Sequence, residues 1–249
     1  VVIEETLSGA LTSLFGQAAV TQEQPAVPEE GEGETDTGGE PAAPTGTAAE
    51  QAAALLDDAD TLFAEADAAL TDGDWGSKTR VVRVNDWTTS WTYGDVISVV
   101  EGAGADLDCL MLPKVQSAEH VVALDLLLSQ VERSAGLDVG RIGIEAQIEN
   151  ALGLVNGDAI AAASRRVETI IFGPADFMAS LNMRSLVVGE QPAGYDVGDA
   201  YHYILMRILM AARAYDKQAI DGPYLQIKDL DGYRRVAGRS AELGVDGKW

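Results

Sequence analysis

The chain of 249 residues is 47% hydrophobic, so it can bury a sizeable core and would normally form one or two domains. Of its 40 acidic side chains, 17 lie in residues 1–76, which contain no Lys or Arg. Residues 77–249 contain the other 23 acidic side chains and all 17 basic ones, so they contribute only −6 to the net charge of −23. No basic stripe is present to displace counterions from phosphates, which argues against nucleic-acid binding.

The single cysteine, Cys109, rules out a disulfide framework and is typical of a reducing compartment. No apolar run is long enough to cross a membrane, and no signal-peptide pattern follows Val1. We therefore expect a cytoplasmic chain without a membrane span.

Residues 1–76 divide into three predicted segments. Residues 1–20 contain a short apolar segment. Residues 21–47 form an acidic linker rich in Pro and Gly, which we expect to be disordered because it lacks the apolar surface to offset its ordering entropy. Residues 48–76 are predicted to form an amphipathic helix, because apolar pairs recur every seven residues behind a capping-box spacing at Thr47 and Glu50. Such a helix needs an apolar partner, either another chain or the following domain.

Strands and helices alternate from residue 77 onward, which is typical of a parallel sheet. The predicted strands are 79–86, 107–115, 142–149, 169–172 and 218–224, with the start of another at 247–249, and the predicted helices are 118–134, 152–164, 200–215 and 230–243. A closed (β/α)8 barrel needs eight strands and roughly 200–250 residues, so these strands and the residues that contain them are too few to close one. The predicted fold class is α/β: an incomplete TIM (β/α)8 barrel over residues 77–249, preceded by the acidic disordered linker and the amphipathic helix.

The segment 141–177 indicates where chemistry would take place. Apolar residues alternate with Glu145, Gln147 and Glu149, as in a half-buried strand whose polar side faces a cavity. The apolar run 169–172 ends in Gly-Pro-Ala just before Asp176. Two carboxylates that follow neighbouring parallel strands meet at one edge of a sheet, and they are the usual protein contribution to a Mg²⁺ site.

Six motifs in this order resemble the citrate lyase β-subunit-like and malyl-CoA lyase family, the HpcH/HpaI aldolase superfamily of Mg²⁺-dependent acyl-CoA lyases. They are VVRVND at 81–86, MLPKV at 111–115, IENALGLVN at 148–156, FGPAD at 172–176, IDGPY at 220–224 and LGVDGKW at 243–249. The resemblance covers residues 77–249 and implies barrel strands three to seven and the start of the eighth. The family's first two strands, its C-terminal strand and its lid have no counterpart.

The resemblance implies roles for individual residues. Glu149 and Asp176 match the metal-binding carboxylates, for Mg²⁺ or Mn²⁺, unless each is a solvated loop acid or helix cap. Arg83 would be the catalytic, substrate-binding residue that holds a carboxylate or a developing enolate, and Glu149 would also contact the substrate. Their position, rather than the resemblance, suggests roles for three more residues. Glu145 and Gln147 share the polar face of Glu149 and would orient the metal ligands or merely fill the barrel. Lys114, at a strand end, would bind a phosphate or carboxylate, or stay solvated.

The resemblance also implies a reaction. A malyl-CoA, citramalyl-CoA or citryl-CoA-like ester would be cleaved into an acyl-CoA and a 2-keto acid, with coenzyme A as part of the substrate. The residues that bind coenzyme A are unknown. A malyl-CoA thioesterase uses the same groups, and a non-catalytic fragment is the alternative from another class. Leu152 departs from the Arg that many family members carry there, which affects the choice of substrate. A complete barrel would be expected to form a homo-oligomer.

Residues 1–76 resemble something different, the C-terminal tail of a family of large membrane proteins of unknown function, UPF0182. The two resemblances join near residues 74–77. A gene fusion or a chimeric reading of two genes would both produce such a join, and the lack of an initiating Met suggests a fragment.

Overall fold

The computed structural model describes residues 61–184, 194–196 and 198–249. The predicted apolar segment, the acidic linker and the first part of the predicted amphipathic helix lie outside these residues. The contacts divide the chain into two units, Val1–Ala66 and Asp67–Trp249, and the second unit contains the sheet. Residues 61–72 are helical, and the helix is followed by a bend at Gly73.

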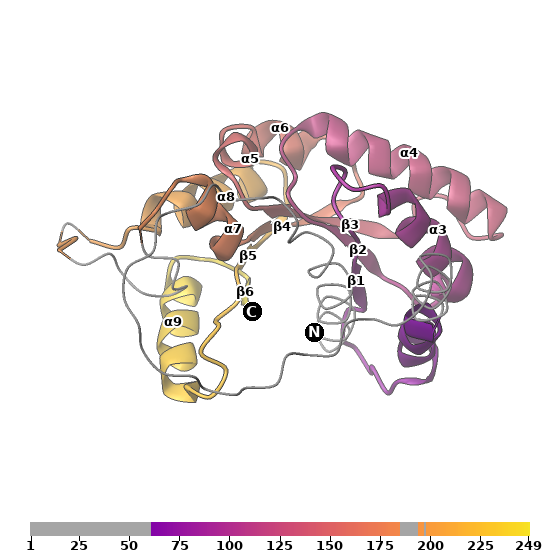
Figure 1. Cartoon of the computed structure of the whole chain (residues 1–249), viewed down its shortest axis with the longest axis horizontal. Helices are drawn as coiled ribbons and strands as arrows, with labels where there is room; N and C mark the ends of the chain where they lie inside the picture. The colour runs from indigo at the N-terminus through magenta and orange to yellow at the C-terminus, as the bar shows by residue number, and fades with distance from the viewer. Residues whose placement is uncertain (1–60, 185–193, 197) are drawn as a thin grey trace, which may run out of the picture. The chain divides into compact units, whose positions relative to one another are not determined.

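The sheet has six parallel strands in chain order, as the alternating pattern predicts. The strands are β1 (Val81–Arg83), β2 (Cys109–Leu112), β3 (Gly143–Ile148), β4 (Val167–Phe172), β5 (Gln218–Asp221) and β6 (Gly247–Lys248). Most are shorter than expected, chiefly β1, β2 and β5, whereas β4 begins two residues earlier than predicted. Figure 1 shows that the sheet curls, so it forms half of a barrel. Within the described part of the chain, β1 and β6 each pair along one side only.

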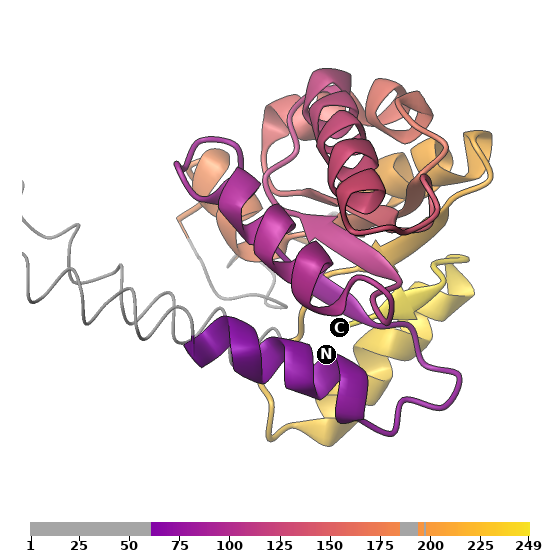
Figure 2. The ribbon, with the colours of Figure 1, turned by 90° about the vertical axis from the view of Figure 1, so that its right-hand side faces the viewer.

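Helices cover the outer side of this half-barrel (Figure 1). They are α3 (Thr92–Ala103), α4 (Ala118–Ser134), α5 (Ala151–Val155), α6 (Gly157–Ala162), α7 (Pro174–Ser180), α8 (His202–Ala214) and α9 (Leu230–Glu242). Figure 2 shows α3 and α4 side by side on one side of the sheet. The predicted helix 152–164 is two short helices, because the chain breaks at Asn156, which ends α5 and begins α6.

Helix α3 was not predicted. Its sequence TYGDVISVVEGA contains two glycines and several β-branched residues, which have low intrinsic helix propensity. Its buried residues include Val96, Val99, Val100 and Ala103, which recur at helical spacing. Packing of this stripe against the rest of the half-barrel outweighs the weak propensity. The stripe was the signal that could have revealed the helix.

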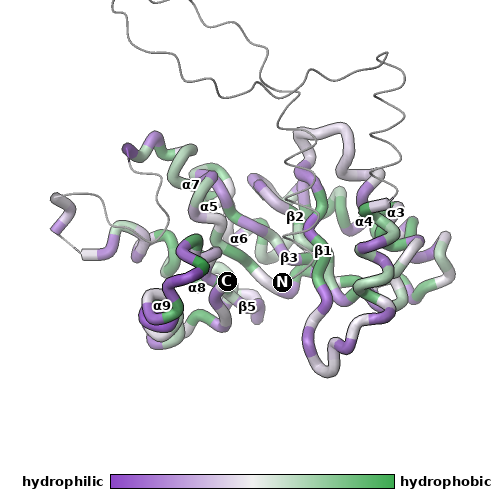
Figure 3. Tube along the Cα trace, turned by 60° about the horizontal axis from the view of Figure 1, so that its bottom comes forward, coloured by the Kyte–Doolittle hydropathy of each residue, from purple (hydrophilic) through white to green (hydrophobic). Residues whose placement is uncertain are grey.

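The strand predicted over 142–149 is present as β3, but it is buried along nearly its whole length rather than half-buried. The four apolar residues of segment 142–148 are fully buried, because they face the covering helices: Ile142, Ile144, Ala146 and Ile148. Gln147 and Glu149 are also buried, on the opposite, inner side of the sheet. The tube in Figure 3 is mainly hydrophobic along β1 to β3, whereas α9 is largely hydrophilic. The sheet therefore has an apolar outer face and a polar inner face near the carboxyl end of β3.

A buried ion pair stabilises the amino-terminal end of strands β3 and β4. Arg166, just before β4, donates from Nη2 to Glu132 Oε2 of α4 at 2.6 Å and from Nη1 to the Ile142 carbonyl at 2.8 Å. Glu132 is fully buried, yet the hydrogen bonds from Arg166 and two backbone N–H groups outweigh the effect of burial and lower its pKa. This network holds α4 against the start of β3 and β4.

Candidate functional site at the carboxyl end of the strands

Glu149 lies directly after β3, at the carboxyl-end mouth of the half-barrel. Glu149 is 6% exposed. Its carboxylate oxygen Oε2 accepts a hydrogen bond of 2.8 Å from the backbone N–H of Lys114, which follows β2. The next residue, Asn150, caps α5 by accepting a hydrogen bond from the N–H of Gly153. The cap fixes where the chain turns from strand to helix and so fixes the position of Glu149.

Gly173 makes room for the Glu149 carboxylate. A Cβ at this position would lie 2.4 Å from Glu149 Cγ and 2.7 Å from Oε1, closer than real Cβ atoms approach other groups. Only glycine therefore allows the segment after β4 to pass so close to the carboxylate. The sequence predicts Gly173 only as part of the break that ends the apolar run 169–172, and its contact with Glu149 was not predicted.

The charge of Glu149 is poorly compensated in this position. Burial raises the pKa of Glu149 to about 7; the positive charge of Arg83 opposes this shift, whereas the negative charge of Asp176 adds to it. A carboxyl group with this pKa is partly protonated at neutral pH, and a bound cation would favour its charged form. The same interactions show that Arg83 and Asp176 lie near Glu149.

Asp176 lies in the first turn of α7, where a carboxylate is favoured, and its side chain is half exposed. Lys114 Nζ lies 3.4 Å from Asp176 Oδ2 and 3.9 Å from Oδ2 of Asp86, a buried residue after β1. Lys114 thus contacts Glu149 through its backbone and Asp176 through its ammonium group. This link between the two carboxylates was not predicted.

Lys114 adopts a left-handed backbone conformation, with φ of +52°. Such a conformation is rare for a residue with a Cβ and costs about 1–2 kcal/mol. Strained residues of this kind cluster at functional sites. The hydrogen bond from its N–H to Glu149 depends on this local backbone geometry.

Arg83 ends β1 and is in register with Met111 of β2, which is in register with Glu145 of β3. Residues paired in a parallel sheet share a face, so Arg83 lies on the same inner face as Glu145 and Gln147. Its charge acts on Glu149, as noted above. The structure therefore brings all three main predicted site residues to one region.

The two remaining predicted site residues differ in their surroundings. Glu145 accepts a 2.9 Å hydrogen bond from the Thr169 hydroxyl on β4. Gln147 is 4% exposed, and its Oε1 has no hydrogen-bond partner within the described part of the chain. Leu152, the residue that departs from the family pattern, is exposed on α5.

The donor chemistry at the mouth suits a hard divalent cation. Two carboxylates, one of them buried with a raised pKa, are the kind of oxygen donors that Mg²⁺ takes from proteins. No group of three or more His, Cys, Asp or Glu side chains is arranged to hold a metal among the described residues. Cys109 is unsuited to ligation, because burial and nearby carboxylates raise the pKa of its thiol to about 12.

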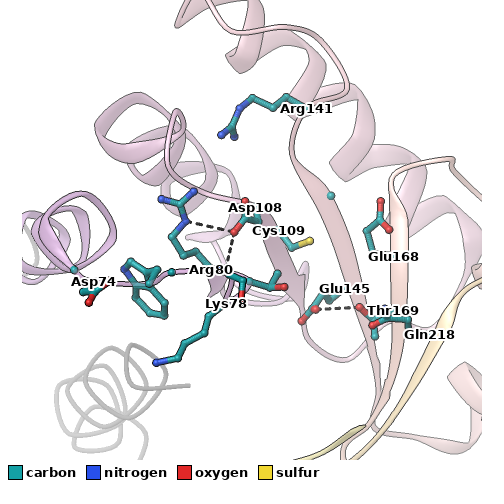
Figure 4. A pocket seen from close by; sticks show the side chains of 16 residues that line it. Asp74, Lys78, Arg80, Asp108, Cys109, Arg141, Glu145, Glu168, Thr169 and Gln218 are labelled. Atoms are coloured by element: carbon teal, nitrogen blue, oxygen red, sulfur yellow. Dashed lines mark hydrogen bonds and ion pairs between the residues drawn. The ribbon is translucent and has the colours of Figure 1, made fainter. Parts of the chain in front are cut away.

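A cavity of about 860 Å³ lies at the opposite, amino-terminal ends of the strands (Figure 4). Figure 4 shows Arg80 directed at Asp108 and Glu145 directed at Thr169. Arg80 also contacts Asp106 at 3.0 Å, so its charge is already compensated. Neither Glu149 nor Asp176 lines this cavity. We therefore place the candidate site at the mouth, where barrels of this type carry their reactive groups.

The curled parallel sheet with carboxylates at its mouth defines an α/β fold of the partial TIM-barrel type. Comparison with known proteins specifies the family. The family HpcH/HpaI aldolase/citrate lyase matches residues 48–249. The chain belongs to this family.

Several relatives are lyases by name. The chain is 36% identical over 189 residues to the L-malyl-CoA/beta-methylmalyl-CoA lyase of Cereibacter sphaeroides (strain ATCC 17025 / ATH 2.4.3), a match covering 73% of the chain and 59% of the relative. It is 31% identical over 191 residues to the malyl-CoA/beta-methylmalyl-CoA/citramalyl-CoA lyase of Chloroflexus aurantiacus, covering 71% of the chain and 55% of that protein. The chain thus spans somewhat more than half the length of these curated relatives.

Solved structures agree with the fold. The citrate lyase beta subunit from M. tuberculosis, complexed with oxaloacetate and magnesium, matches with a TM-score of 0.56 and 27% identity, covering 73% of this chain and 71% of that one. Haloferax volcanii malate synthase matches with a TM-score of 0.66, and the match covers 79% of this chain and 56% of that one. At 19% identity this similarity shows the fold alone.

The family match confirms the resemblance drawn from the motifs. It begins at residue 48 and so includes the segment 48–76, whose resemblance to UPF0182 stays a prediction. Within the described ranges, no helix has both the length and the hydropathy to cross a bilayer.

Proposed function

We propose that this chain carries the metal-binding and keto-acid-binding part of a CoA-ester carbon–carbon lyase. The reaction is the reversible cleavage of a malyl-CoA, citramalyl-CoA or citryl-CoA-like ester into an acyl-CoA and a 2-keto acid. The observation that supports it most is the buried Glu149 carboxylate at the mouth, which Arg83 and Asp176 influence through their charges. The names of the relatives support the choice of substrate class.

In this proposal Glu149 and Asp176 hold Mg²⁺, with Mn²⁺ as an alternative. The bound ion would supply positive charge that polarises the substrate carbonyl and neutralises negative charge as the carbon–carbon bond breaks. The backbone N–H of Lys114 and the absence of a side chain at Gly173 keep the Glu149 carboxylate in place. Arg83 binds the substrate carboxylate or the enolate oxygen through its guanidinium group.

The partners of the proposed enzyme are the acyl-CoA ester and the 2-keto acid. A cytoplasmic location and assembly into a homo-oligomer complete the proposal. The single cysteine is buried, and the pKa of its thiol is raised. A lone cysteine of this kind is compatible with a reducing compartment.

Product analysis tests the proposal. We expect the purified chain, supplied with malyl-CoA and Mg²⁺, to release glyoxylate and acetyl-CoA, and we expect Glu149→Gln and Asp176→Asn to abolish this release. Malate and free coenzyme A as products would instead identify a thioesterase. A folded, soluble sample that binds no Mg²⁺ and forms neither product pair would refute the enzymatic role and leave a non-catalytic fragment.

A further inference from the structure

The ammonium group of Lys114 lies between two carboxylates at the mouth of the half-barrel. Its Nζ is 3.4 Å from Oδ2 of Asp176 and 3.9 Å from Oδ2 of Asp86. The backbone N–H of the same residue donates to Glu149 Oε2 at 2.8 Å, and its positive charge opposes the rise in the pKa of Glu149. Lys114 therefore acts on both carboxylates to which the proposed function assigns the cation.

The two ion pairs of Lys114 differ in exposure. The side chain of Asp176 is 52% exposed, whereas that of Asp86 is 12% exposed. An exposed ion pair is weak because water screens it, so the contact with Asp176 is easily exchanged for another. The second oxygen of Asp86, Oδ1, accepts hydrogen bonds from the backbone N–H and the hydroxyl of Thr88, so the loop after β1 fixes this carboxylate. Asp86 is thus a fixed and less screened partner for the ammonium group.

A divalent cation bound by Glu149 and Asp176 would compete with this ammonium group. Mg²⁺ binds its oxygen ligands at about 2.1 Å, and Lys114 contacts an oxygen of Asp176. Two positive charges on one carboxylate repel each other. The ammonium group has another partner within reach, because moving from 3.9 Å to about 2.9 Å from Asp86 Oδ2 would complete a charge-assisted hydrogen bond. The flexible four-carbon side chain of lysine allows such a movement.

We propose that Lys114 is a built-in counter-cation that regulates cation binding at the mouth. Its ammonium group neutralises Asp176 in the cation-free protein and transfers to Asp86 when a divalent cation binds. This inference rests on the proposed function and deepens it, because it identifies a residue that lowers the affinity of the site for the metal. The backbone of Lys114 holds Glu149 in place while its side chain competes for Asp176, so one residue both builds the site and limits its affinity.

Calorimetric titration with Mg²⁺ at constant ionic strength tests the inference. Lys114→Met removes the ammonium group and keeps both the Cβ and the backbone N–H that binds Glu149. We expect it to bind Mg²⁺ about tenfold more tightly than the unaltered chain, because a unit charge within about 5 Å of a divalent ion changes the affinity by roughly this factor even at the dielectric constant of water. A merely structural role would instead weaken binding. The matched control, Lys78→Met, removes an exposed lysine at the opposite end of the strands and should change the affinity by less than about twofold.

Asp86→Asn tests whether the ammonium group transfers. Without the charge of Asp86 the ammonium group stays on Asp176, so this substitution should weaken Mg²⁺ binding at least about threefold more in the unaltered chain than in Lys114→Met. Equal effects in the two backgrounds would overturn the transfer.

The remaining outcomes separate this inference from the proposed function. If the unaltered chain binds Mg²⁺ and Lys114→Met binds it no more tightly, only this inference fails, and that comparison decides the matter even if Asp86→Asn does not fold. If neither the unaltered chain nor Lys114→Met binds Mg²⁺, the proposed function fails together with the inference.

Discussion

Glu149 illustrates how the environment of one residue sets its chemistry. Its pKa is raised to about 7, chiefly by burial, so protons and cations compete for the carboxylate near neutral pH. In the cation-free protein the raised pKa favours the protonated form. The stability that this group contributes is therefore present below its ordinary pKa of 4.5 and lost as pH rises through about 7.

The first prediction concerns the pH dependence of Mg²⁺ binding. We expect the Mg²⁺ affinity to increase as pH rises from 6 to 8, because the cation requires the deprotonated carboxylate. Calorimetry at three pH values measures the affinity and the protons released. Glu149→Gln is the control, since it should bind Mg²⁺ weakly at every pH. An affinity independent of pH in the unaltered chain would contradict the raised pKa.

The second prediction tests the space at Gly173. Gly173→Ala places a methyl group 2.4 Å from Glu149 Cγ, so the carboxylate must move. We expect Mg²⁺ to bind at least tenfold more weakly, since displacements of about 1 Å at such sites cost up to about 100-fold in activity. Gly94→Ala is a matched control, because a methyl group there meets no atom within 4 Å. Unchanged Mg²⁺ binding in Gly173→Ala would exclude this positioning role.

The third prediction concerns the left-handed backbone at Lys114. Lys114→Gly and Lys114→Ala both remove the ammonium group near Asp176 and keep the N–H that binds Glu149. Glycine adopts a positive φ without strain, so Lys114→Gly should be about 1 kcal/mol more stable than Lys114→Ala. Urea denaturation measures the difference. Equal stability of the two variants would mean that the strain is relieved elsewhere.

Individual elements show why local patterns succeed or fail as predictors. Strand β3 was predicted correctly because one of its faces is apolar and the other polar, and this alternation survives in the sequence. Helix α3 was missed because its residues have weak helix propensity, although its apolar residues recur at helical spacing. The break between α5 and α6 is a local event at Asn156 that the apolar run conceals.

The fourth prediction concerns the ion pair between α4 and the start of β4. Arg166→Met would leave Glu132 buried without its charged partner, so we expect a loss of about 3–5 kcal/mol in unfolding free energy. The double variant Arg166→Met with Glu132→Leu is the control, and it should recover most of this loss because no unpaired charge is left. Urea denaturation at pH 7 distinguishes the two.

Acid should weaken the same contact. The pKa of Glu132 lies below its ordinary value of 4.5, so its contribution to stability is complete above pH 4.5 and is lost as pH falls through the lowered pKa. Between pH 6 and pH 3 the unfolding free energy of the unaltered chain should fall further than that of the double variant, which lacks the Glu132 carboxylate. A constant difference would show that the ion pair does not set the acid sensitivity.

On the scale of the whole molecule, binding and folding are linked through the mouth of the half-barrel. The residues that meet there come from the ends of β1, β2, β3 and β4 and the start of α7, so a cation at Glu149 and Asp176 would bind only the folded sheet. The fifth prediction follows from mass action. At 100 times its dissociation constant, Mg²⁺ should stabilise the fold by about 2.7 kcal/mol and raise the Tm accordingly.

Thermal unfolding with and without Mg²⁺ measures this effect. Glu149→Gln is again the control, and its Tm should not respond to Mg²⁺. An identical Tm for the unaltered chain at all Mg²⁺ concentrations would show that the carboxylates do not hold the ion in the folded state.

The sequence by itself determined the parallel α/β architecture, the order of the strands, the polar inner face of β3 and the family. These features depend on the alternation of residue types and on the order of motifs, both of which can be read along the chain. It also singled out Glu149, Asp176 and Arg83. Only the tertiary structure decided how closely Gly173 approaches Glu149, that Lys114 links the two carboxylates, and that the amide oxygen of Gln147 is buried without a hydrogen-bond partner among the described residues. Those features depend on contacts between strands far apart in the chain, and spacing along one strand carries no information about them.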